Sequence, residues 1–239
     1  MDALAIAFDG DDTLWESETA FAVTQERLRA LLVPRVAAEV LDARLYATER
    51  ANLELYGYGA KSFTLSTLET AIELAGDDLA ISDVVAILAL GKELLSHPVE
   101  LLPDVEEIVA WAAETAGWTL VVTKGDLFHQ ESKVALSGLA DTFDAVEIVS
   151  EKDEATYARI LARHRIDPAT FVMVGNSLRS DIAPVLAIGG AAVHVPHPLT
   201  WAHEHVDDES PLRAHPRFRA IDALCDLPTA IADLRRPLD

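Results

Sequence analysis

Three carboxylates and a threonine directly follow a short apolar run near the N-terminus. Residues 3–8 read ALAIAF, and Asp9, Asp11, Asp12 and Thr13 lie within the next five positions. Like charges on neighbouring residues repel one another, and here they adjoin a segment that is predicted to be a buried strand. A strand that served stability alone would not end in this way, so the group is a candidate for chemistry.

Polar groups also follow three other predicted strands, in residues 118–125, 145–150 and 170–175. In an open parallel sheet the reactive groups collect in the loops beyond the carboxyl ends of the strands, so we expect all of them at one edge. They comprise amines, hydroxyls, an amide, a backbone N–H and a further carboxylate: Thr123, Lys124, Gly125, Lys152, Asn176, Ser177 and Asp181.

The donor types in this set point to one kind of reaction. Carboxylate and amide oxygens suit Mg²⁺, which keeps several waters and takes few protein ligands. Lysine amines and free backbone N–H groups suit the oxygens of a phosphoryl group. The set as a whole therefore predicts phosphoryl transfer from a phosphate monoester.

A parallel sheet is needed to bring these groups together, and the C-terminal part of the chain predicts one. From about residue 100 short apolar runs alternate with helical periods as far as a last strand in residues 191–195. This alternation is typical of an α/β fold with a doubly wound parallel sheet, right-handed crossovers and helices on both faces. Residues 3–8 are expected to lie inside that sheet.

Residues 15–99 break the alternation. They carry helical periods in residues 21–56, 64–75 and 82–96 and no convincing strand, and residues 97–103 are interpreted as a return hinge. We therefore expect a Rossmann-like core domain of residues 1–14 and 100–239. An all-helical domain of residues 15–99 is expected to be inserted after the first strand.

The four sequence segments that carry these polar residues, each of which follows a predicted strand, together resemble the motifs of a known family. "FDGDDTL" is similar to the D-x-D-x-T signature of the haloacid dehalogenase-like (HAD) hydrolases. "VVTKG", Lys152 in "SEKDE", and "VGNSLRSD" resemble the second, third and fourth motifs of that family, in the right order and each after a predicted strand. The resemblance implies a doubly wound core with a helical cap.

The resemblance implies that Asp9 is the nucleophile, which attacks phosphorus and forms an aspartyl-phosphate. Asp11 would protonate the leaving oxygen and then activate water against the intermediate. In the dehalogenases that name the family this position is not an acid, because no leaving alkoxide needs a proton. Asp11 therefore favours the phosphatase branch and disfavours a dehalogenase.

The other motifs imply the remaining contacts. Thr123, Lys124 and the Gly125 N–H would bind the phosphoryl oxygens, and Lys152 would balance the charge between the nucleophile and the phosphoryl group. The Mg²⁺ ligands that the resemblance implies are Asp9, Asp11 through its backbone carbonyl, Asn176 and Asp181. Many members have Asp where this chain has Asn176, so which residue of the fourth motif makes the direct bond stays open.

The helical insertion resembles the cap of the subgroup that acts on small molecules, and a cap argues against protein substrates. Its least helical stretch is residues 55–66, "LYGYGAKSFTLS", which we interpret as a loop between cap helices. Within it Tyr58, Lys61 and Ser62 are candidates for substrate contact.

Composition limits the partners. The chain of 239 residues carries 40 Asp and Glu against 19 Lys and Arg, a formal net charge of −21. Nucleic acid and anionic membranes are bound through positive surface, so neither is expected as a partner. The chain has one cysteine, Cys225, which excludes an internal disulfide and is expected to be a buried small residue. No targeting or membrane segment is visible, and we expect a cytoplasmic protein.

Two other functions are compatible with these motifs. A phosphomutase would use the same catalytic residues, and a catalytically silent binding or regulatory protein could share the scaffold.

The sequence also supports three local predictions. Asp12 is expected to be a solvated or loop-capping carboxylate, and residues 221–234 are expected to form an amphipathic helix. The histidines after the last strand are interpreted as incidental to a loop: His194, His197, His203 and His205.

Overall fold

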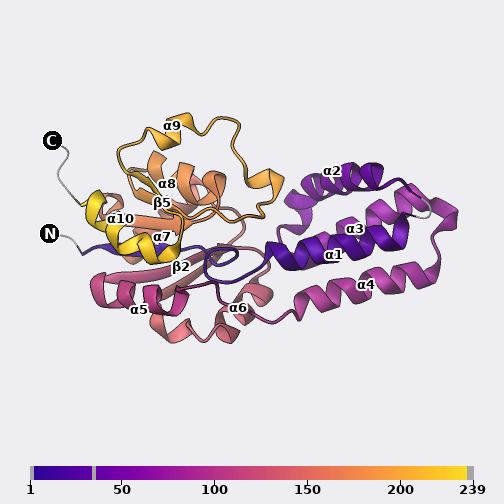
Figure 1. The fold of residues 1–239 in the computed structure, drawn as a ribbon, viewed down its shortest axis with the longest axis horizontal. Coiled ribbons are helices and arrows are strands. Elements are labelled where there is room, and N and C mark those ends of the chain that lie inside the picture. Colours follow the sequence, from indigo (N-terminus) through magenta and orange to yellow (C-terminus); the bar gives the residue numbers. More distant parts are fainter. Residues whose placement is uncertain (1–2, 34–35, 236–239) are drawn as a thin grey trace. The chain divides into compact units, whose positions relative to one another are not determined.

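The computed structural model describes residues 3–33 and 36–235 and contains one parallel sheet (Figure 1). The sheet has six strands in the order β3-β2-β1-β4-β5-β6. Their bounds are Ala5–Phe8 (β1), Trp118–Lys124 (β2), Ala145–Val149 (β3), Phe171–Gly175 (β4), Ala191–His194 (β5) and Phe218–Ala220 (β6). This is the doubly wound parallel sheet that the sequence predicts.

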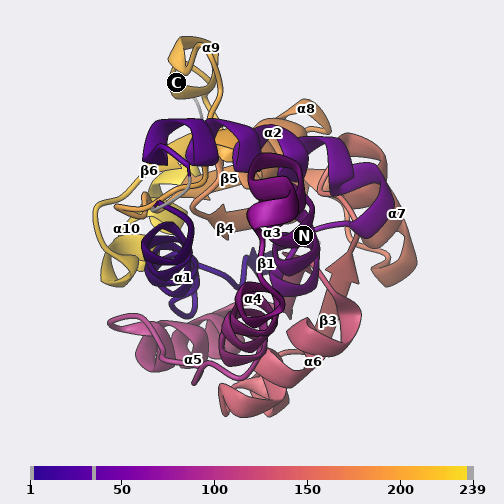
Figure 2. The same cartoon turned by 90° about the vertical axis from the view of Figure 1, so that its right-hand side faces the viewer.

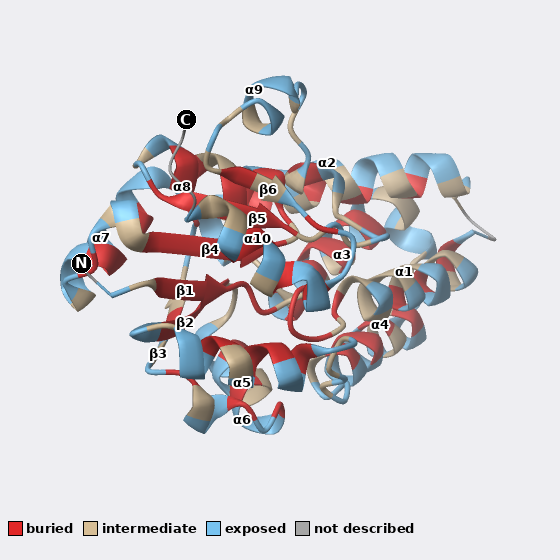
Figure 3. Cartoon of the chain, turned by 60° about the vertical axis from the view of Figure 1, so that its left-hand side comes forward, coloured by how far each residue is buried: buried red, intermediate tan, exposed pale blue. Residues whose placement is uncertain are grey.

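Strand β1 lies in the middle of the sheet because all four of its residues are apolar and fully buried, as Figure 3 shows in red. Its Ala7 pairs with Leu120 of β2 on one side and with Met173 of β4 on the other. The direction in which successive strands are added reverses between β1 and β4. That reversal leaves a crevice beyond the carboxyl ends of the strands, which is where ligands bind in such sheets.

Helices cover both faces of the sheet because successive side chains of each strand point to opposite sides (Figure 2). Ile6 and Phe8 face a core formed with helices α5 (Val105–Thr115), α6 (Leu127–Leu136) and α10 (Leu227–Leu234). Ala5 and Ala7 face the opposite core, formed with α7 (Glu154–His164) and α8 (Ala183–Ala187). The strand ends are thereby fixed from both sides.

The described residues form two compact units, residues 1–18 with 99–239 and residues 19–98. We name them the core unit and the helical unit; their boundary lies a few residues beyond the expected one at residue 14. The helical unit contains most of α1 (Glu18–Leu32), with α2 (Ala38–Tyr56), α3 (Ala60–Ala75) and α4 (Ile81–Leu95). Leu28, Leu45, Phe63 and Ile87 pack in its interior.

Three local predictions are wrong. The stretch 55–66 is not a loop, because α3 begins at Ala60 and leaves only residues 57–59 between the helices. The helix predicted for residues 221–234 is confined to α10, and the short strand β6 and the small helix α9 (Ser210–Arg213) precede it. Cys225 is exposed, not buried, because the 3₁₀ turn before α10 places it on the surface.

Residues 34 and 35, within the helical stretch predicted for 21–56, lie outside the described residues. In the part of the chain that the structure describes, no helix is both long enough and apolar enough to cross a bilayer.

Candidate active site

Two buried carboxylates and one lysine meet at the carboxyl edge of the sheet. Asp9 follows β1, Lys152 lies between β3 and α7, and Asp181 lies in a single π-turn after β4. The Lys152 Nζ donates hydrogen bonds to Asp9 Oδ1 at 2.6 Å and to Asp181 Oδ1 at 2.7 Å. The structure thus brings together three of the residues that the sequence predicts for the site.

This trio carries more negative than positive charge in a place that water does not reach. Burial and the charge of Asp181 raise the pKa of Asp9 to about 8, although Lys152 acts in the opposite direction. Burial would lower the pKa of Lys152, but the two carboxylates outweigh it and hold that pKa above its usual range. Lys152 therefore stays charged, but one ammonium does not offset two buried carboxylates, so a cation would favour the ionised form of Asp9.

The two oxygens of Asp9 have different surroundings. Oδ1 accepts the Lys152 ammonium and the Gly10 N–H, the latter at 2.7 Å. Among the described residues, Oδ2 accepts no hydrogen bond. One oxygen is therefore held in place while the other remains available for a reacting atom or a cation.

Asp181 is held more completely than Asp9. Its Oδ2 accepts the Ser177 N–H at 3.0 Å while its Oδ1 accepts Lys152. A Cβ on Gly175 would lie 2.2 Å from this Oδ2, so only glycine fits at the end of β4. The Asn176 Oδ1 accepts one long hydrogen bond of 3.5 Å from Thr13 Oγ1, which leaves it the freer oxygen of the fourth motif.

Asp11 is anchored by three side chains. Its Oδ1 accepts the Trp15 Nε1–H at 2.6 Å and the Lys133 ammonium at 2.7 Å, and its Oδ2 accepts Gln130 Nε2 at 3.2 Å. Burial would raise the pKa of Asp11, but Lys133 and the hydrogen bonds outweigh it, so that pKa lies below its usual range. A Cβ on Gly10 would lie 2.6 Å from the Trp15 ring, so only glycine fits between the first two aspartates.

The second motif is hydrogen-bonded to Gln130, which also donates to Asp11. Thr123 Oγ1 is buried and accepts a hydrogen bond of 2.7 Å from Gln130 Nε2. Gly125, at φ +144°, donates its N–H to the Val149 carbonyl at 3.3 Å. Lys124 donates to Glu204, whereas the ammonium that binds Asp9 is that of Lys152. In this structure the Lys124 amine and the Gly125 N–H thus have protein partners where a phosphoryl group was expected.

The Glu204 carboxylate is surrounded by hydroxyl and ammonium donors from the second and fourth motifs. Its Oε1 accepts Lys124 Nζ at 2.5 Å, and its Oε2 accepts Ser177 Oγ at 2.6 Å and Ser180 Oγ at 2.5 Å. Burial would raise the pKa of Glu204, but Lys124 and the two hydroxyls outweigh it and lower the pKa to about 2. Glu204 is therefore ionised at neutral pH.

Asp12 closes the loop that leads out of the first motif. The backbone N–H groups of Ser17 and Glu18 both donate to Asp12 Oδ1, at 2.9 and 3.0 Å, which confirms the loop-capping prediction. Asp12 is buried, however, and not solvated. Burial raises the pKa of Asp12 to about 6 and that of Glu18 to about 7, and the neighbouring carboxylates act in the same direction.

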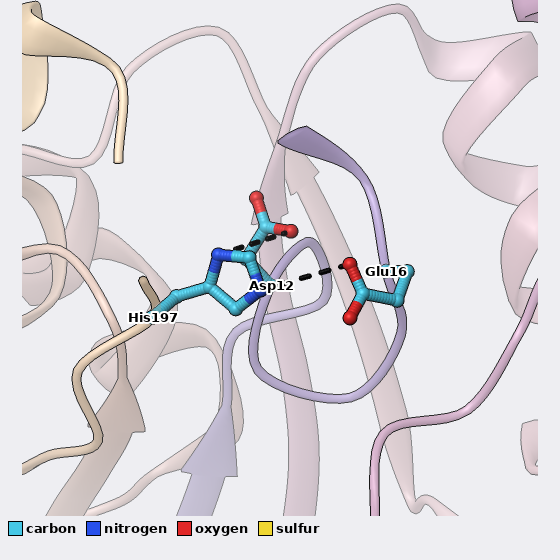
Figure 4. Close-up of side chains that lie close together, drawn as sticks. All are labelled: Asp12, Glu16 and His197. Carbon is cyan, nitrogen blue, oxygen red and sulfur yellow. Dashed lines mark ion pairs between the residues drawn. The ribbon is translucent and has the colours of Figure 1, made fainter. Parts of the chain in front are cut away.

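His197 is not incidental to its loop. Its ring lies between two carboxylates, with Nδ1 3.8 Å from Asp12 Oδ1 and Nε2 3.6 Å from Glu16 Oε2 (Figure 4). These three side chains could together hold a metal ion. They form a different group from the predicted ligands of the first and fourth motifs, and the Asp12 Oδ1 in it already accepts two backbone N–H groups.

The predicted ligand set fits a divalent cation by its chemistry. Asp9 and Asp181 share a single ammonium, so a second positive charge would be needed to offset both carboxylates when both are ionised. The Asp9 carboxylate and the Asn176 amide supply hard oxygens of the kind that Mg²⁺ takes. The residues that could hold such an ion are Asp9, Asp11 through its carbonyl, Asn176 and Asp181.

Three candidate residues belong to the helical unit. Lys61 and Ser62 lie in the first turn of α3, where Ser62 is buried and Lys61 is exposed, and Tyr58 lies just before that helix. Their predicted contact with substrate stays a prediction.

Several residues of the site were not found from the sequence: Trp15, Gln130, Lys133, Ser180, His197 and Glu204. Gln130 and Lys133 could have been predicted from the sequence, because they are three residues apart and therefore share a face of the helix that follows the second motif. Glu204 could not have been predicted in this way. It is 80 positions from Lys124 in an irregular segment, so only the folded chain brings the two together.

The comparisons with known proteins agree with this geometry. A family model that describes haloacid dehalogenase-like hydrolases matches residues 4–189, and the chain therefore belongs to the haloacid dehalogenase-like hydrolase family. A solved haloacid dehalogenase-like family hydrolase from Xanthomonas campestris is 41% identical, with a TM-score of 0.86. The match covers 97% of this chain and 91% of that one.

More distant structures share the fold and differ in their described activity. A predicted phosphoglycolate phosphatase from Haemophilus somnus is 16% identical, with a TM-score of 0.61 and coverage of 95% and 97% of the two chains. A 2-haloacid dehalogenase from Pseudomonas syringae is 23% identical, with a TM-score of 0.62 and coverage of 97% and 99%. No protein of curated function matches the sequence. Membership of the family therefore makes the chain a hydrolase without choosing between these activities.

Proposed function

We propose that this hydrolase is a Mg²⁺-dependent phosphatase that cleaves a small-molecule phosphate monoester through a phosphorylated Asp9. One observation carries the choice of phosphatase over dehalogenase. Position 11 is an aspartate, and Lys133, Gln130 and Trp15 hold its carboxylate two residues beyond the nucleophile. A proton donor and acceptor there serves an oxygen leaving group, whereas a halide needs no proton.

In the first step the free Oδ2 of Asp9 attacks phosphorus, and the bond between phosphorus and the ester oxygen breaks. Asp11 gives a proton to that oxygen, so the alcohol leaves neutral. Asp11 has to take up this proton when substrate binds, because Lys133 and the hydrogen bonds keep its carboxyl ionised in the substrate-free protein. In the second step Asp11 takes a proton from water, whose oxygen attacks phosphorus. Phosphate leaves, and the Asp9 carboxylate is restored.

The neighbouring side chains support these steps. Lys152 holds Oδ1 of Asp9 and thereby orients Oδ2, and its charge would balance the incoming phosphoryl oxygens. The Thr123 hydroxyl would bind one of those oxygens while Gln130 holds it in place. The lowered pKa of Asp11 suits the second step, in which a carboxylate must accept a proton from water.

Magnesium would supply positive charge to the phosphoryl oxygens and to the excess of carboxylates at this edge. Asp9, the Asp11 carbonyl and Asn176 would hold the ion. The two oxygens of Asp181 accept Lys152 and the Ser177 N–H, so we assign Asp181 to supporting the loop beside the ion.

We propose that the helical unit is a cap that selects a small substrate. Its support is its place in the chain, between the strands that carry the first and second motifs, and its all-helical composition. A closing cap would exclude water and bulky partners. Because nucleic acid and anionic membranes are bound through positive surface, the strongly acidic chain argues against both as partners, and the expected cytoplasmic location stays a prediction.

The test is phosphate release from a panel of small phosphate esters, run with Mg²⁺ and with EDTA. The variant Asp9→Asn removes the nucleophile, and Asp141→Asn, at an exposed position of the core unit, is its matched control. Halide release from a short 2-haloacid is measured beside it. We expect phosphate release that needs both Mg²⁺ and Asp9, unchanged release by Asp141→Asn, and no halide.

Other results would assign other functions. Halide release that depends on Asp9, without turnover of any ester, would contradict the phosphatase. Transfer of the phosphoryl group between positions of one sugar phosphate, with a bisphosphate activator, would indicate a mutase. A folded protein with neither activity would be a silent scaffold.

A further inference from the structure

The segment after β5 contacts three of the loops that carry the proposed chemistry. We name residues 195–205 the strap. Its His197 lies beside Asp12 in the first motif, and its Glu204 binds Lys124 at the end of β2 and Ser177 after β4. In the sheet β4 and β1 separate β5 from β2, so the strap spans the edge at which the proposed site lies.

Glu204 makes the densest set of these contacts. Its side chain is 11% exposed, and that of Lys124 is 14% exposed. Lys124 Nζ also donates to Ser180 Oγ at 2.8 Å and lies 3.6 Å from Glu151. The two Glu204 oxygens thus accept hydrogen bonds from one ammonium and two hydroxyls, and that ammonium also donates to one of the hydroxyls.

The two serines adjoin the proposed metal ligand Asn176 and the loop-supporting residue Asp181 in the chain. Ser177 follows Asn176 directly and Ser180 precedes Asp181. The Ser177 Oγ also accepts the Ser180 N–H at 2.9 Å, and the Ser180 carbonyl accepts the Tyr157 hydroxyl at 3.1 Å. Hydroxyls held from both sides fix the backbone that carries the two neighbouring side chains.

Lys124 connects the same carboxylate to the second motif. It directly follows Thr123, whose hydroxyl we assign to the phosphoryl group. A carboxylate that binds Lys124 and both serines therefore sets the distance between the loop after β2 and the loop after β4. Glu204 therefore affects whether the loop after β2 can bind the phosphoryl group while the loop after β4 binds Mg²⁺.

We propose that Glu204 is a positioning residue that holds the metal-binding loop after β4 against the phosphate-binding loop after β2, through Ser177, Ser180 and Lys124. This inference rests on the proposed function, because it concerns the same Mg²⁺ and phosphoryl sites. Glu204 itself touches neither ligand.

The first readout is Mg²⁺ binding to the substrate-free protein, measured by titration calorimetry with MgCl₂. Changing a residue that orients metal ligands typically weakens binding 10- to 100-fold, so we expect Glu204→Gln to bind Mg²⁺ about tenfold more weakly than the wild type. Ser180→Ala removes one clamping hydroxyl, leaves Glu204 paired with Lys124, and should weaken binding in the same direction. Glu114→Gln, at an exposed position of α5, should bind like the wild type.

The second readout is the kinetics of phosphate release at saturating Mg²⁺. A residue that only supports the fold would lower the amount of active enzyme and leave KM unchanged. We expect both variants to raise KM for the preferred ester while retaining most of kcat, because Asp9 and Asp11 are untouched. Circular dichroism and thermal melting select the variants that are folded.

The outcomes separate this inference from the function on which it rests. If the wild type binds Mg²⁺ and releases phosphate but both folded variants match it in Mg²⁺ affinity and KM, the inference is overturned and the function stands. If Glu204→Gln does not fold, Ser180→Ala alone decides in the same way. If the wild type neither binds Mg²⁺ nor hydrolyses an ester, both the function and the inference fail.

Discussion

The core unit and the helical unit use their charged residues in opposite ways. In the core unit charges are buried in groups: Asp9 and Asp181 share Lys152, and Glu204 pairs with Lys124. In the helical unit, ion pairs between helices lie on the surface, such as Arg44 with Glu73, which are 45% and 48% exposed, and the buried Asp83 accepts a backbone N–H at the start of α4. Only the buried groups have pKa values that depart far from their usual ranges toward neutral pH.

The two units also differ in how their buried polar groups are satisfied. In the core unit the oxygens of Asp181 and Glu204 each have defined donors. In the helical unit, among the described residues, the hydroxyls of Thr48, Thr67 and Thr70 are buried without a hydrogen-bond partner. Buried hydroxyls without partners cost stability and fix no geometry.

This contrast shows where the chain gives up stability for chemistry. In the core unit three carboxylates are buried beside few ammonium groups. Burying them lowers the free energy of unfolding, so a protein selected for stability alone would not bring them together. The helical unit has no such concentration of charge, and its interior is mostly leucine, alanine and phenylalanine. The following changes test that contrast, from the largest expected effect to the smallest.

Lys152→Met should be the most damaging change. It leaves Asp9 and Asp181 buried beside one another without their shared cation, and breaking a buried pair in this way costs about 3–5 kcal/mol. The free energy of unfolding, measured by urea denaturation at neutral pH, gives the loss. Lys92→Met, at an exposed position of α4, should stay within about 0.5 kcal/mol of the wild type. Equal losses in the two variants would contradict the contrast between the units.

Asp9→Asn should make the metal-free protein more stable in alkaline solution. Burial and Asp181 raise the pKa of Asp9 to about 8 from 3.8, so its ionisation destabilises the folded state as pH rises through that range. The variant lacks this ionisation, and we expect it to exceed the wild type by about 2 kcal/mol at a pH of about 9. The difference should vanish near a pH of about 3, below the ordinary pKa of the group, where Asp9 is protonated in both the folded and the unfolded wild type. Denaturation in EDTA at both pH values measures it, and a variant less stable than the wild type at high pH would refute the raised pKa.

Thr70→Val should stabilise the helical unit. The Thr70 hydroxyl is fully buried and has no partner among the described residues, so a methyl group of similar size should gain about 1 kcal/mol. Thr64→Val is the matched control on the same helix, because the Thr64 hydroxyl donates to the Ala60 carbonyl at 2.7 Å. Thermal melting compares the two variants, and a gain in Thr64→Val equal to that in Thr70→Val would show that the missing partner is not the cause.

Glu73→Gln should have the smallest effect. The ion pair with Arg44 is about half exposed, and such pairs contribute within about 0.5 kcal/mol. Urea denaturation at low and at high salt should give nearly the same curves as the wild type. A loss as large as that of Lys152→Met would remove the distinction between surface and buried charge.

Much of the core could be predicted from the sequence because its signals are local. Residues 3–8 form a continuous apolar run, and the later strands alternate with helices of regular period, so the doubly wound sheet follows from pattern alone. Strand ends locate Asp9, Lys152 and Asp181 at one edge, since parallel strands share their direction. The prediction of a loop over residues 55–66 is wrong because the two glycines lie before α3, whose helical period begins at Ala60.

The rest of the candidate site depends on contacts that no local pattern records. Whether Lys124 faces a phosphate or a carboxylate depends on Glu204, which lies in a segment without periodicity. His197 likewise lies near Asp12, from which it is far apart in the sequence. Such contacts are made by irregular segments whose course is set by tertiary packing, so the residue types show that chemistry is possible but do not show the partners.

The account depends most directly on the chemical identity of the intermediate. The measurement is mass spectrometry of the protein quenched in acid during turnover of its preferred ester with Mg²⁺, after digestion with a protease that is active in acid. We expect a phosphoryl group on the peptide that contains Asp9 in the wild type and none in Asp9→Asn. Phosphate release in which the phosphoryl group appears on another residue, or on no residue of the protein, would contradict the assignment of Asp9 as the nucleophile.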